Sequence, residues 1–194
     1  MDEKSARPAT GLRGKIFLIG YRACGKTAVG KLLASRLGWR FTDMDREIRD
    51  RCAMSIKEMV ARQGWDHFRE RERQLLQELS RQPPTEPGTV VATGGGAVLQ
   101  QDLWAEIKAA YPVIWLTADP ATIAARISAD TASDDQRPSL TDQGLLGEIS
   151  EVLEQRQELY RRAAHRQMDT TTRDPSALVA DIIDWLNGRH GDNT

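Results

Sequence analysis

The segment Gly20–Thr27 reads Gly-Tyr-Arg-Ala-Cys-Gly-Lys-Thr, and it limits the possible folds of this chain more than any other feature. It matches the pattern Gly-x-x-x-x-Gly-Lys-Thr, a loop whose backbone N–H groups wrap a phosphate. This pattern requires a strand before it and a helix after it. Lys15–Gly20 is an apolar run that suits a buried strand, and apolar residues at helical spacing follow the loop up to Gly38. The sequence therefore predicts a phosphate-binding loop at the start of an α/β fold.

The residue types in this loop have separate physical tasks. Lys26 brings a positive charge to the β- and γ-phosphates of a nucleotide, and the hydroxyl of Thr27 can ligate Mg²⁺. Ala23 stands where many small-molecule kinases with this loop carry glycine, so a positive φ there would strain its backbone. Cys24 is interpreted as a small space-filling residue, although a thiol beside a helix N-terminus can be reactive. The predicted nucleotide-binding residues of the loop are Gly20, Ala23, Cys24, Gly25, Lys26, Thr27 and Ala28.

Composition narrows the class of protein. The chain has 194 residues, of which 40% are hydrophobic and 28% charged, and this suits one ordinary globular domain. Its formal net charge of −1 argues against nucleic acid or an acidic membrane as a partner. No apolar run reaches the ~20 residues that a membrane span needs. Cys24 and Cys52 are too few for a disulfide framework, and no export signal precedes the first strand, so we expect a cytoplasmic monomer.

Strands and helices are predicted to alternate along the chain, which is typical of a parallel α/β sheet. Ser55 and Glu58 form a capping-box pattern that opens a helix. The predicted strands are residues 15–20, 39–42, 89–93, 113–116 and 166–170. The helix after the phosphate loop is followed by predicted helices at residues 55–64, 65–79, 103–110, 120–129, 145–164 and 174–186.

Two further motifs follow predicted strands, at the edge where open α/β sheets bind ligands. Asp43 and Asp45 end the second strand, and one of them can act on a metal through water while the other orients, or takes a proton from, an acceptor hydroxyl. A solvated acidic turn is the plainer interpretation. Gly94, Gly95 and Gly96 follow the third strand, where they permit close approach of the backbone to a ligand or simply form a tight connection.

Two arginines share helix faces with apolar residues. Arg156 lies on one face with Ile149 and Tyr160, and Arg69 lies one turn from Glu72. An inward guanidinium needs an anionic partner, so Arg69 either pairs with Glu72 or binds a carboxylate ligand, and spacing alone leaves both open.

The polar stretch Asp130–Thr141 reads as a mobile loop and contains Arg137. An arginine on a closing loop can stabilise the charge of a transferring phosphoryl group, whereas a plain surface arginine is the simpler interpretation. The three histidines show no metal-binding spacing with one another or with the cysteines.

Together these motifs resemble the shikimate kinase family of small P-loop kinases, over about Lys15 to Leu186. The resemblance rests on the order and spacing of Gly20–Thr27, Asp43-Met44-Asp45, Phe68-Arg69, Thr93-Gly94-Gly95-Gly96, Arg137-Pro138 and Glu151-x-x-x-x-Arg156-x-x-x-Tyr160. It implies a nucleoside-monophosphate-kinase-like fold of three layers, with a five-stranded parallel sheet flanked by helices. It also implies Mg²⁺-dependent transfer of the ATP γ-phosphate to the 3-hydroxyl of shikimate, a step toward chorismate and the aromatic amino acids.

The resemblance assigns roles to residues of this chain. Asp45 would bind the substrate hydroxyls and serve as a candidate base, and Asp43 would act on Mg²⁺ through water beside Thr27. Arg69 and Arg156 would hold the substrate carboxylate. The implied catalytic residues are Lys26, Asp45 and Arg137; the implied substrate contacts are Asp45, Arg69, Gly94, Gly95, Gly96 and Arg156; and Arg126, Arg137 and Pro175 would join the phosphate loop in binding ATP.

The same resemblance divides the chain into parts. A single kinase domain is expected over residues 14–188, between tails at residues 1–13 and 189–194. Within it, residues 44–80 would bind the substrate and residues 130–142 would form a mobile lid. Two alternatives stay open: another small-metabolite kinase such as gluconate kinase, whose substrate also has a carboxylate, and a non-catalytic nucleotide-binding module. The second should have lost a charge-handling residue, and this chain keeps Lys26, Asp45 and Arg137.

Overall fold

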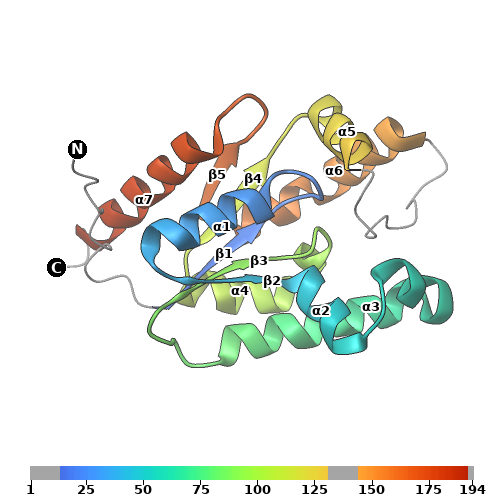
Figure 1. The fold of residues 1–194 in the computed structure, drawn as a ribbon, viewed down its shortest axis with the longest axis horizontal. Helices are drawn as coiled ribbons and strands as arrows, with labels where there is room; N and C mark the ends of the chain where they lie inside the picture. Colours follow the sequence, from blue (N-terminus) through green and yellow to red (C-terminus); the bar gives the residue numbers. More distant parts are fainter. Residues whose placement is uncertain (1–13, 131–143, 192–194) are drawn as a thin grey trace.

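A five-stranded parallel sheet forms the centre of the computed structural model, which describes residues 14–130 and 144–191 (Figure 1). The strand order is β2-β3-β1-β4-β5, and every described neighbour pair is parallel. The strands are β1 (Lys15–Ile19), β2 (Arg40–Asp43), β3 (Thr89–Ala92), β4 (Val113–Thr117) and β5 (Arg166–Asp169). This confirms the predicted sheet, with strand ends that differ from the predicted ones by a residue or two.

Helices cover both faces of the sheet, so the molecule has three layers (Figure 1). They are α1 (Lys26–Leu37), α2 (Met44–Cys52), α3 (Ile56–Arg81), α4 (Gln101–Ala110), α5 (Pro120–Ala129), α6 (Gly144–Ala163) and α7 (Pro175–Gly191), with a 3₁₀ turn η1 at Ala97–Leu99. In the described part of the chain, none of these helices combines the length and the hydropathy of a membrane span.

The alternation of side chains along β1 separates two cores. Ile16 and Leu18 point to one face, where they join the apolar residues of α1 and α7. Phe17 and Ile19 point to the other face and pack with residues of α3, α4 and α6. All five residues of β1 are buried, as expected for a central strand of a parallel sheet.

Helix α3 is two helices joined at a kink, as the sequence predicts. It begins with a full capping box: the backbone N–H of Glu58 donates to Ser55 Oγ at 3.1 Å, and Glu58 Oε2 accepts from the Ser55 N–H at 3.0 Å. Gly64 interrupts the helix with φ 82°, a conformation that glycine adopts without strain. Buried residues on both sides of the kink pack into the same core: Ile56 and Met59 before it, and Phe68 and Leu76 after it.

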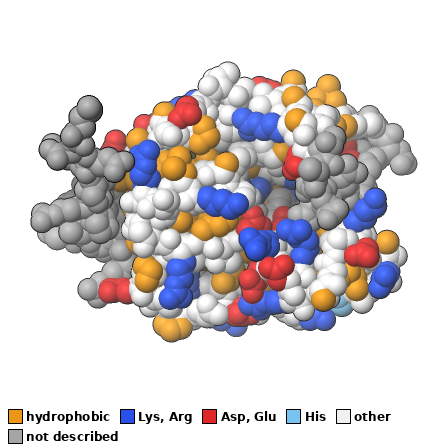
Figure 2. Space-filling view, viewed as in Figure 1, with side chains coloured by type: hydrophobic (Ala, Val, Ile, Leu, Met, Phe, Trp, Pro, Cys, Tyr) orange, Lys and Arg blue, Asp and Glu red, His pale blue; other side chains and the backbone are white. Residues whose placement is uncertain are grey.

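The main differences from the sequence prediction are one helix that was not predicted and one that is longer than predicted. No helix was predicted directly after β2, but α2 begins there, capped by Asp43, whose carboxylate accepts from the N–H of Asp45 at 3.1 Å. Only Met44 and Ile48 of α2 are buried, so its apolar periodicity is weak, and Figure 2 shows acidic and basic side chains gathered over it. Helix α7 continues to Gly191 instead of ending at Leu186, so residues 189–191 of the predicted tail are helical.

Candidate active site

The phosphate loop follows β1 and leads into α1, as predicted. Gly20 has φ 141°, and a Cβ there would overlap the carbonyl oxygen of Leu116, so only glycine fits. Ala23 has φ 58°, which is the positive φ at which an alanine is strained, at a cost of about 1 kcal/mol. Cys24 is 1% exposed, and this agrees with a space-filling role.

Lys26 lies inside the loop that it helps to form. Its ammonium group donates to the carbonyl oxygens of Gly20 at 2.8 Å and Tyr21 at 2.7 Å, and the side chain is buried. These bonds hold a positive charge at the centre of a ring of backbone groups, beside the N-terminus of α1. Loop and charge together favour an anion at this point. Thr27 and Ala28 follow in the exposed first turn of α1.

Thr27 and Asp43 meet although 16 residues separate them. The Thr27 hydroxyl donates to Asp43 Oδ2 at 2.7 Å, while Asp43 Oδ1 caps α2. A hydroxyl and a carboxylate are hard oxygen ligands of the kind that Mg²⁺ prefers, and Mg²⁺ usually takes only one or two protein ligands beside substrate phosphates. The donor set therefore fits Mg²⁺. No cluster of three or more His, Cys, Asp or Glu suited to a metal occurs among residues 14–130 and 144–191.

Arg126 braces the back of the phosphate loop. Its guanidinium donates to the carbonyl oxygen of Ala23 at 3.3 Å and to both oxygens of Thr170, at 3.0 Å for Oγ1 and 2.6 Å for the carbonyl. The Thr170 hydroxyl in turn donates to the carbonyl oxygen of Cys24 at 3.0 Å. The sequence analysis did not identify Thr170. Pro175 is exposed in the first turn of α7, and its contact with adenine stays a prediction.

The triple glycine brings charged side chains of α2 and α3 together with the phosphate loop. A Cβ on Gly94 would overlap the Glu72 carboxylate and lie 2.8 Å from Asp45 Oδ1. A Cβ on Gly96 would overlap the Arg69 guanidinium, and one on Gly95 would lie 3.1 Å from the backbone nitrogen of the loop residue 22. Glycine is needed here because three charged side chains and the phosphate loop all pack directly against this backbone.

Arg69 pairs with Glu72, which realises one of the two interpretations that spacing left open. Nη1 of Arg69 lies 2.6 Å from Glu72 Oε2, and Glu72 is completely buried. The guanidinium also lies 5.4 Å from the ring centroids of Trp65 and Phe68. The hydrogen bond to Glu72 uses one of five N–H donors, and the Arg69 side chain keeps 17% of its exposure. The pair therefore orients Arg69 and still leaves it able to grip a carboxylate.

Arg156 approaches the same glycines from α6. Its Nη1 donates to the carbonyl oxygen of Gly95 at 3.2 Å, and the Tyr160 hydroxyl donates to that oxygen at 2.6 Å. Burial lowers the pKa of the Arg156 guanidinium, and the positive charge of Arg69 lowers it further. Burial likewise raises the pKa of Tyr160, so its hydroxyl stays protonated as a donor. Two guanidinium groups that repel each other across one loop form a site that an anion would stabilise.

A partly buried ion pair beside the site was not predicted. Nη2 of Arg22, in the phosphate loop, lies 2.9 Å from Oε1 of Glu148, which is 1% exposed on α6. The available signal was that Glu148 precedes Ile149 on the buried side of the helix. Arg137 and the lid prediction lie outside the described residues. Apart from Pro175, the other predicted site residues occupy two groups, one around the phosphate loop and one around the triple glycine, at the carboxyl ends of β1, β2 and β3.

Known proteins resemble this chain in sequence and in fold. The family model of shikimate kinase matches residues 22–187. A shikimate kinase 2 from Yersinia pestis (strain Pestoides F) is 43% identical over 173 residues, or 89% of this chain and 95% of that protein. The chain therefore belongs to the shikimate kinase family. The structure of a shikimate kinase from Acinetobacter baumannii in complex with shikimate matches with a TM-score of 0.80 at 30% identity, covering 91% of this chain and 94% of that one. A gluconokinase from Sinorhizobium meliloti, at 16% identity and a TM-score of 0.55, shares the fold alone.

Proposed function

Because the chain belongs to the shikimate kinase family, we propose that it transfers the γ-phosphate of ATP to the 3-hydroxyl of shikimate, giving shikimate 3-phosphate and ADP. This reaction is a step toward chorismate and the aromatic amino acids. The observation that carries the proposal is the packing around the triple glycine: Asp45, Arg69 and Arg156 all contact this backbone, next to the phosphate loop. Two guanidinium groups suit a substrate carboxylate, and the Asp45 carboxylate suits substrate hydroxyl groups, while the buried Glu72 carboxylate orients Arg69.

The donor half of the site is proposed to bind ATP and Mg²⁺. The loop from Gly20 to Ala28 would hold the phosphates, with Lys26 at the β- and γ-phosphates. Thr27 and Asp43 would hold Mg²⁺, Asp43 through a water molecule, and bound Mg²⁺ would neutralise phosphate charge. Arg126 fixes the loop from behind, and we propose that it and Pro175 flank the adenine.

The acceptor half is proposed to position the reacting hydroxyl. Arg69 and Arg156 would bind the shikimate carboxylate, and this fixes the ring so that its 3-hydroxyl faces the γ-phosphate. The hydroxyl oxygen forms a bond to the γ-phosphorus as the bond to the β,γ-bridging oxygen breaks, and ADP leaves with that electron pair. Asp45 would orient the hydroxyl and accept its proton. We further propose that Arg137 stabilises the phosphoryl charge during transfer.

A coupled ADP-release assay tests this function. Shikimate, gluconate and nucleoside monophosphates are offered in turn, each with ATP and Mg²⁺. We expect turnover with shikimate and at least about tenfold lower kcat/KM with every other acceptor, because the chain is 43% identical to a shikimate kinase 2 and shares only the fold with a gluconokinase. Absence of turnover with shikimate, or faster turnover with gluconate, would overturn the proposal. No turnover with any acceptor, together with normal ATP binding, would instead favour a nucleotide-binding module.

We also propose the setting in which the protein works. A net charge of −1 gives no overall attraction to nucleic acid, so we propose the two small-molecule substrates as its partners. A monomer in the cytoplasm would suffice, because the described residues of one chain supply both halves of the site. Sedimentation velocity at micromolar concentration tests the monomer, and a dimer there would contradict it.

A further inference from the structure

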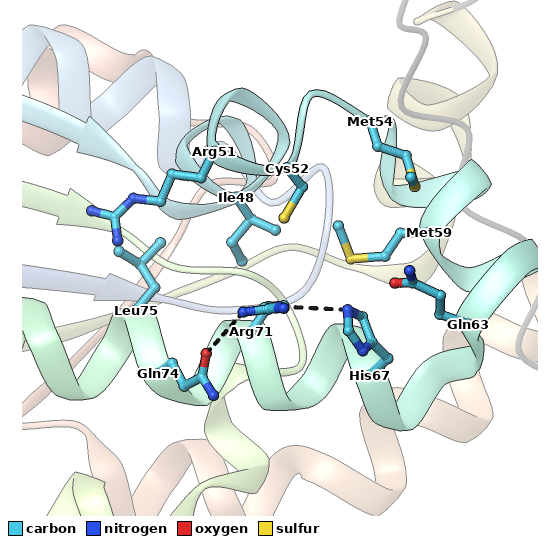
Figure 3. Close-up of a pocket in the computed structure, with 10 residues that line it drawn as sticks. All are labelled: Ile48, Arg51, Cys52, Met54, Met59, Gln63, His67, Arg71, Gln74 and Leu75. Carbon is cyan, nitrogen blue, oxygen red and sulfur yellow. Dashed lines mark hydrogen bonds between the residues drawn. The ribbon is translucent and has the colours of Figure 1, made fainter.

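A second pocket lies between α2 and α3, away from the triple glycine (Figure 3). Its volume is about 350 Å³, near the lower end of the ~300–1,000 Å³ range of small-molecule sites. Residues two apart on a helix point about 200° away from each other. Arg69 faces the glycines, so Arg71 faces the other way, into this pocket. The pocket is therefore separate from the acceptor site, although both are built on the same helices.

Apolar side chains form the base of the pocket, and sulfur-containing side chains contribute to its lining. Ile48, Met59 and Leu75 are almost completely buried and line its base. In Figure 3 the sulfur atoms of Cys52 and Met59 turn toward the space between the helices. Thioether and thiol groups are polarizable and adapt to the shape of an apolar ligand, and they make favourable contacts with aromatic rings. This part of the pocket suits a compact apolar body.

The charge at the rim is positive. Arg51 and Arg71 line the pocket, and no carboxylate does among the residues that line it. Arg51 is already compensated, because it donates to Glu47 at 2.8 Å and to both oxygens of Glu78 at 2.6 and 3.0 Å.

Arg71 is different from Arg51. Within the described residues its hydrogen bonds go to two neutral groups, His67 Nε2 at 3.4 Å and Gln74 Oε1 at 3.3 Å, and both are long (Figure 3). A planar guanidinium with weak neutral partners, above an apolar floor, matches a carboxylate that carries an apolar body.

We propose that this α2–α3 pocket is a binding site for a small monocarboxylate with an apolar body. The carboxylate would pair with Arg71 at the rim, while the body would fill the space above Ile48, Met59 and Leu75. A neutral ligand of the same shape would lack the ion pair, and a short polar carboxylate would lack the apolar contact.

Methionine NMR gives a direct test. The chain has five methionines; two of them, Met54 and Met59, line the pocket, and Met168 lies on β5. The full chain is labelled with [methyl-¹³C]methionine and titrated with 3-phenylpropionate in the presence of saturating shikimate, which keeps the probe away from Arg69 and Arg156. We expect saturable shifts of the Met54 and Met59 methyl signals and no shift of Met168.

Two comparisons test whether binding depends on the carboxylate of the probe. Arg71→Gln should weaken binding of 3-phenylpropionate at least about tenfold, as should replacing the probe by neutral 3-phenylpropionamide. Arg73→Gln is the matched control: it removes the same charge two residues further along α3, where the side chain pairs with Asp102 and does not line the pocket. Its affinity for the probe should equal that of the unchanged protein.

Several results would overturn the site. These are no saturation of the Met54 and Met59 shifts at probe concentrations on the order of 10 mM, equal binding of acid and amide, or equal binding by Arg71→Gln. If Arg71→Gln lowers Tm, the acid and amide comparison on the unchanged protein decides alone. The readout does not use turnover, and only the blocking of Arg69 and Arg156 by shikimate rests on the proposed function. If shikimate itself does not bind, the Met54 and Met59 shifts and the Arg71→Gln comparison still report on this pocket, because Arg71 faces away from Arg69.

Discussion

Single residues at the triple glycine determine how closely the surrounding charged side chains can approach the backbone. Gly94 and Gly96 leave room for the carboxylates of Asp45 and Glu72 and for the Arg69 guanidinium. A side chain as small as a methyl group would displace them. Ala23 shows the opposite case, because it keeps a side chain at φ 58° and carries the strain.

Gly96→Ala should disable acceptor binding while sparing the donor loop. The new Cβ would overlap Arg69 Nη1, so this guanidinium must move from its place beside Glu72. We expect KM for shikimate to rise at least about tenfold, with ATP affinity within about twofold of the original. Steady-state kinetics and ATP titration measure both. Gly188→Ala is the control, because nothing lies within 4 Å of its built Cβ; an unchanged KM in Gly96→Ala would contradict the packing argument.

Asp45→Asn should remove turnover while leaving ATP bound. An amide has nearly the same shape as the carboxylate but neither its charge nor its capacity to accept the hydroxyl proton. We expect kcat to fall at least about a hundredfold and the ATP dissociation constant to change little, because the donor loop makes its own contacts. ADP release and ATP titration give the two values. An active Asp45→Asn enzyme would exclude Asp45 from this role.

At the scale of elements, α6 connects the two halves of the site. Arg156 and Tyr160 hold the carbonyl of Gly95, and about two turns earlier on the same helix Glu148 pairs with Arg22 of the phosphate loop. Neither contact is local, since 126 residues separate Arg22 from Glu148. A single helix therefore aligns the donor loop with the glycine loop.

A double-mutant cycle on Arg22 and Glu148 should show strong coupling. Glu148 is buried, so replacing Arg22 by glutamine removes this ion-pair partner of the Glu148 carboxylate and should lower the free energy of unfolding. Once Arg22 is replaced, replacing Glu148 by glutamine as well should lower it by less than the same change does in the original protein. We expect a coupling free energy on the order of 1 kcal/mol or more from urea unfolding at pH 7. The exposed pair Arg173 and Asp181, at 2.6 Å, is the control and should couple by less than about 0.5 kcal/mol. Equal coupling in the two cycles would show that the Arg22–Glu148 contact carries no special weight.

At the scale of the whole molecule, one histidine links stability to pH. His165 lies where β5 joins the sheet, and its Nδ1 accepts from the N–H of Val113 at 3.1 Å, which requires a nitrogen without a proton. Burial lowers the pKa of His165 to about 4, and the positive charges of Arg189 and Lys108 contribute. The unfolded chain has a histidine pKa of about 6.5. Between these values the unfolded state binds the proton and the native state does not.

The free energy of unfolding should therefore fall as pH decreases from about 6.5 to 4, and this contribution is complete above pH 6.5. His165→Asn keeps an oxygen that can accept from Val113 and cannot be protonated in this range. We expect urea unfolding of this variant to lose less stability than the original protein between pH 7 and 5. The same pH dependence in both proteins would mean that His165 is protonated in the native state.

Much of this protein is determined by local sequence. The phosphate loop, the five strands, the Ser55–Glu58 capping box and the break at Gly64 follow from residue types within a few positions of each other, so periodicity and turn chemistry predict them. Helix α2 was not predicted, because a short helix with two buried residues gives little periodic signal. Helix α7 continues beyond its predicted end.

The tertiary structure determines which helices, strands and loops contact one another. From the sequence, Arg69 could either pair with Glu72 or bind a carboxylate ligand. The fold shows that it pairs with buried Glu72 and still faces the glycines. The choice of Arg22 as the partner of Glu148 and the α2–α3 pocket cannot be predicted from any one segment. The physical reason is that contacts between distant segments depend on how strands and helices pack in three dimensions, whereas hydrophobic periodicity, caps and loop motifs act within one segment.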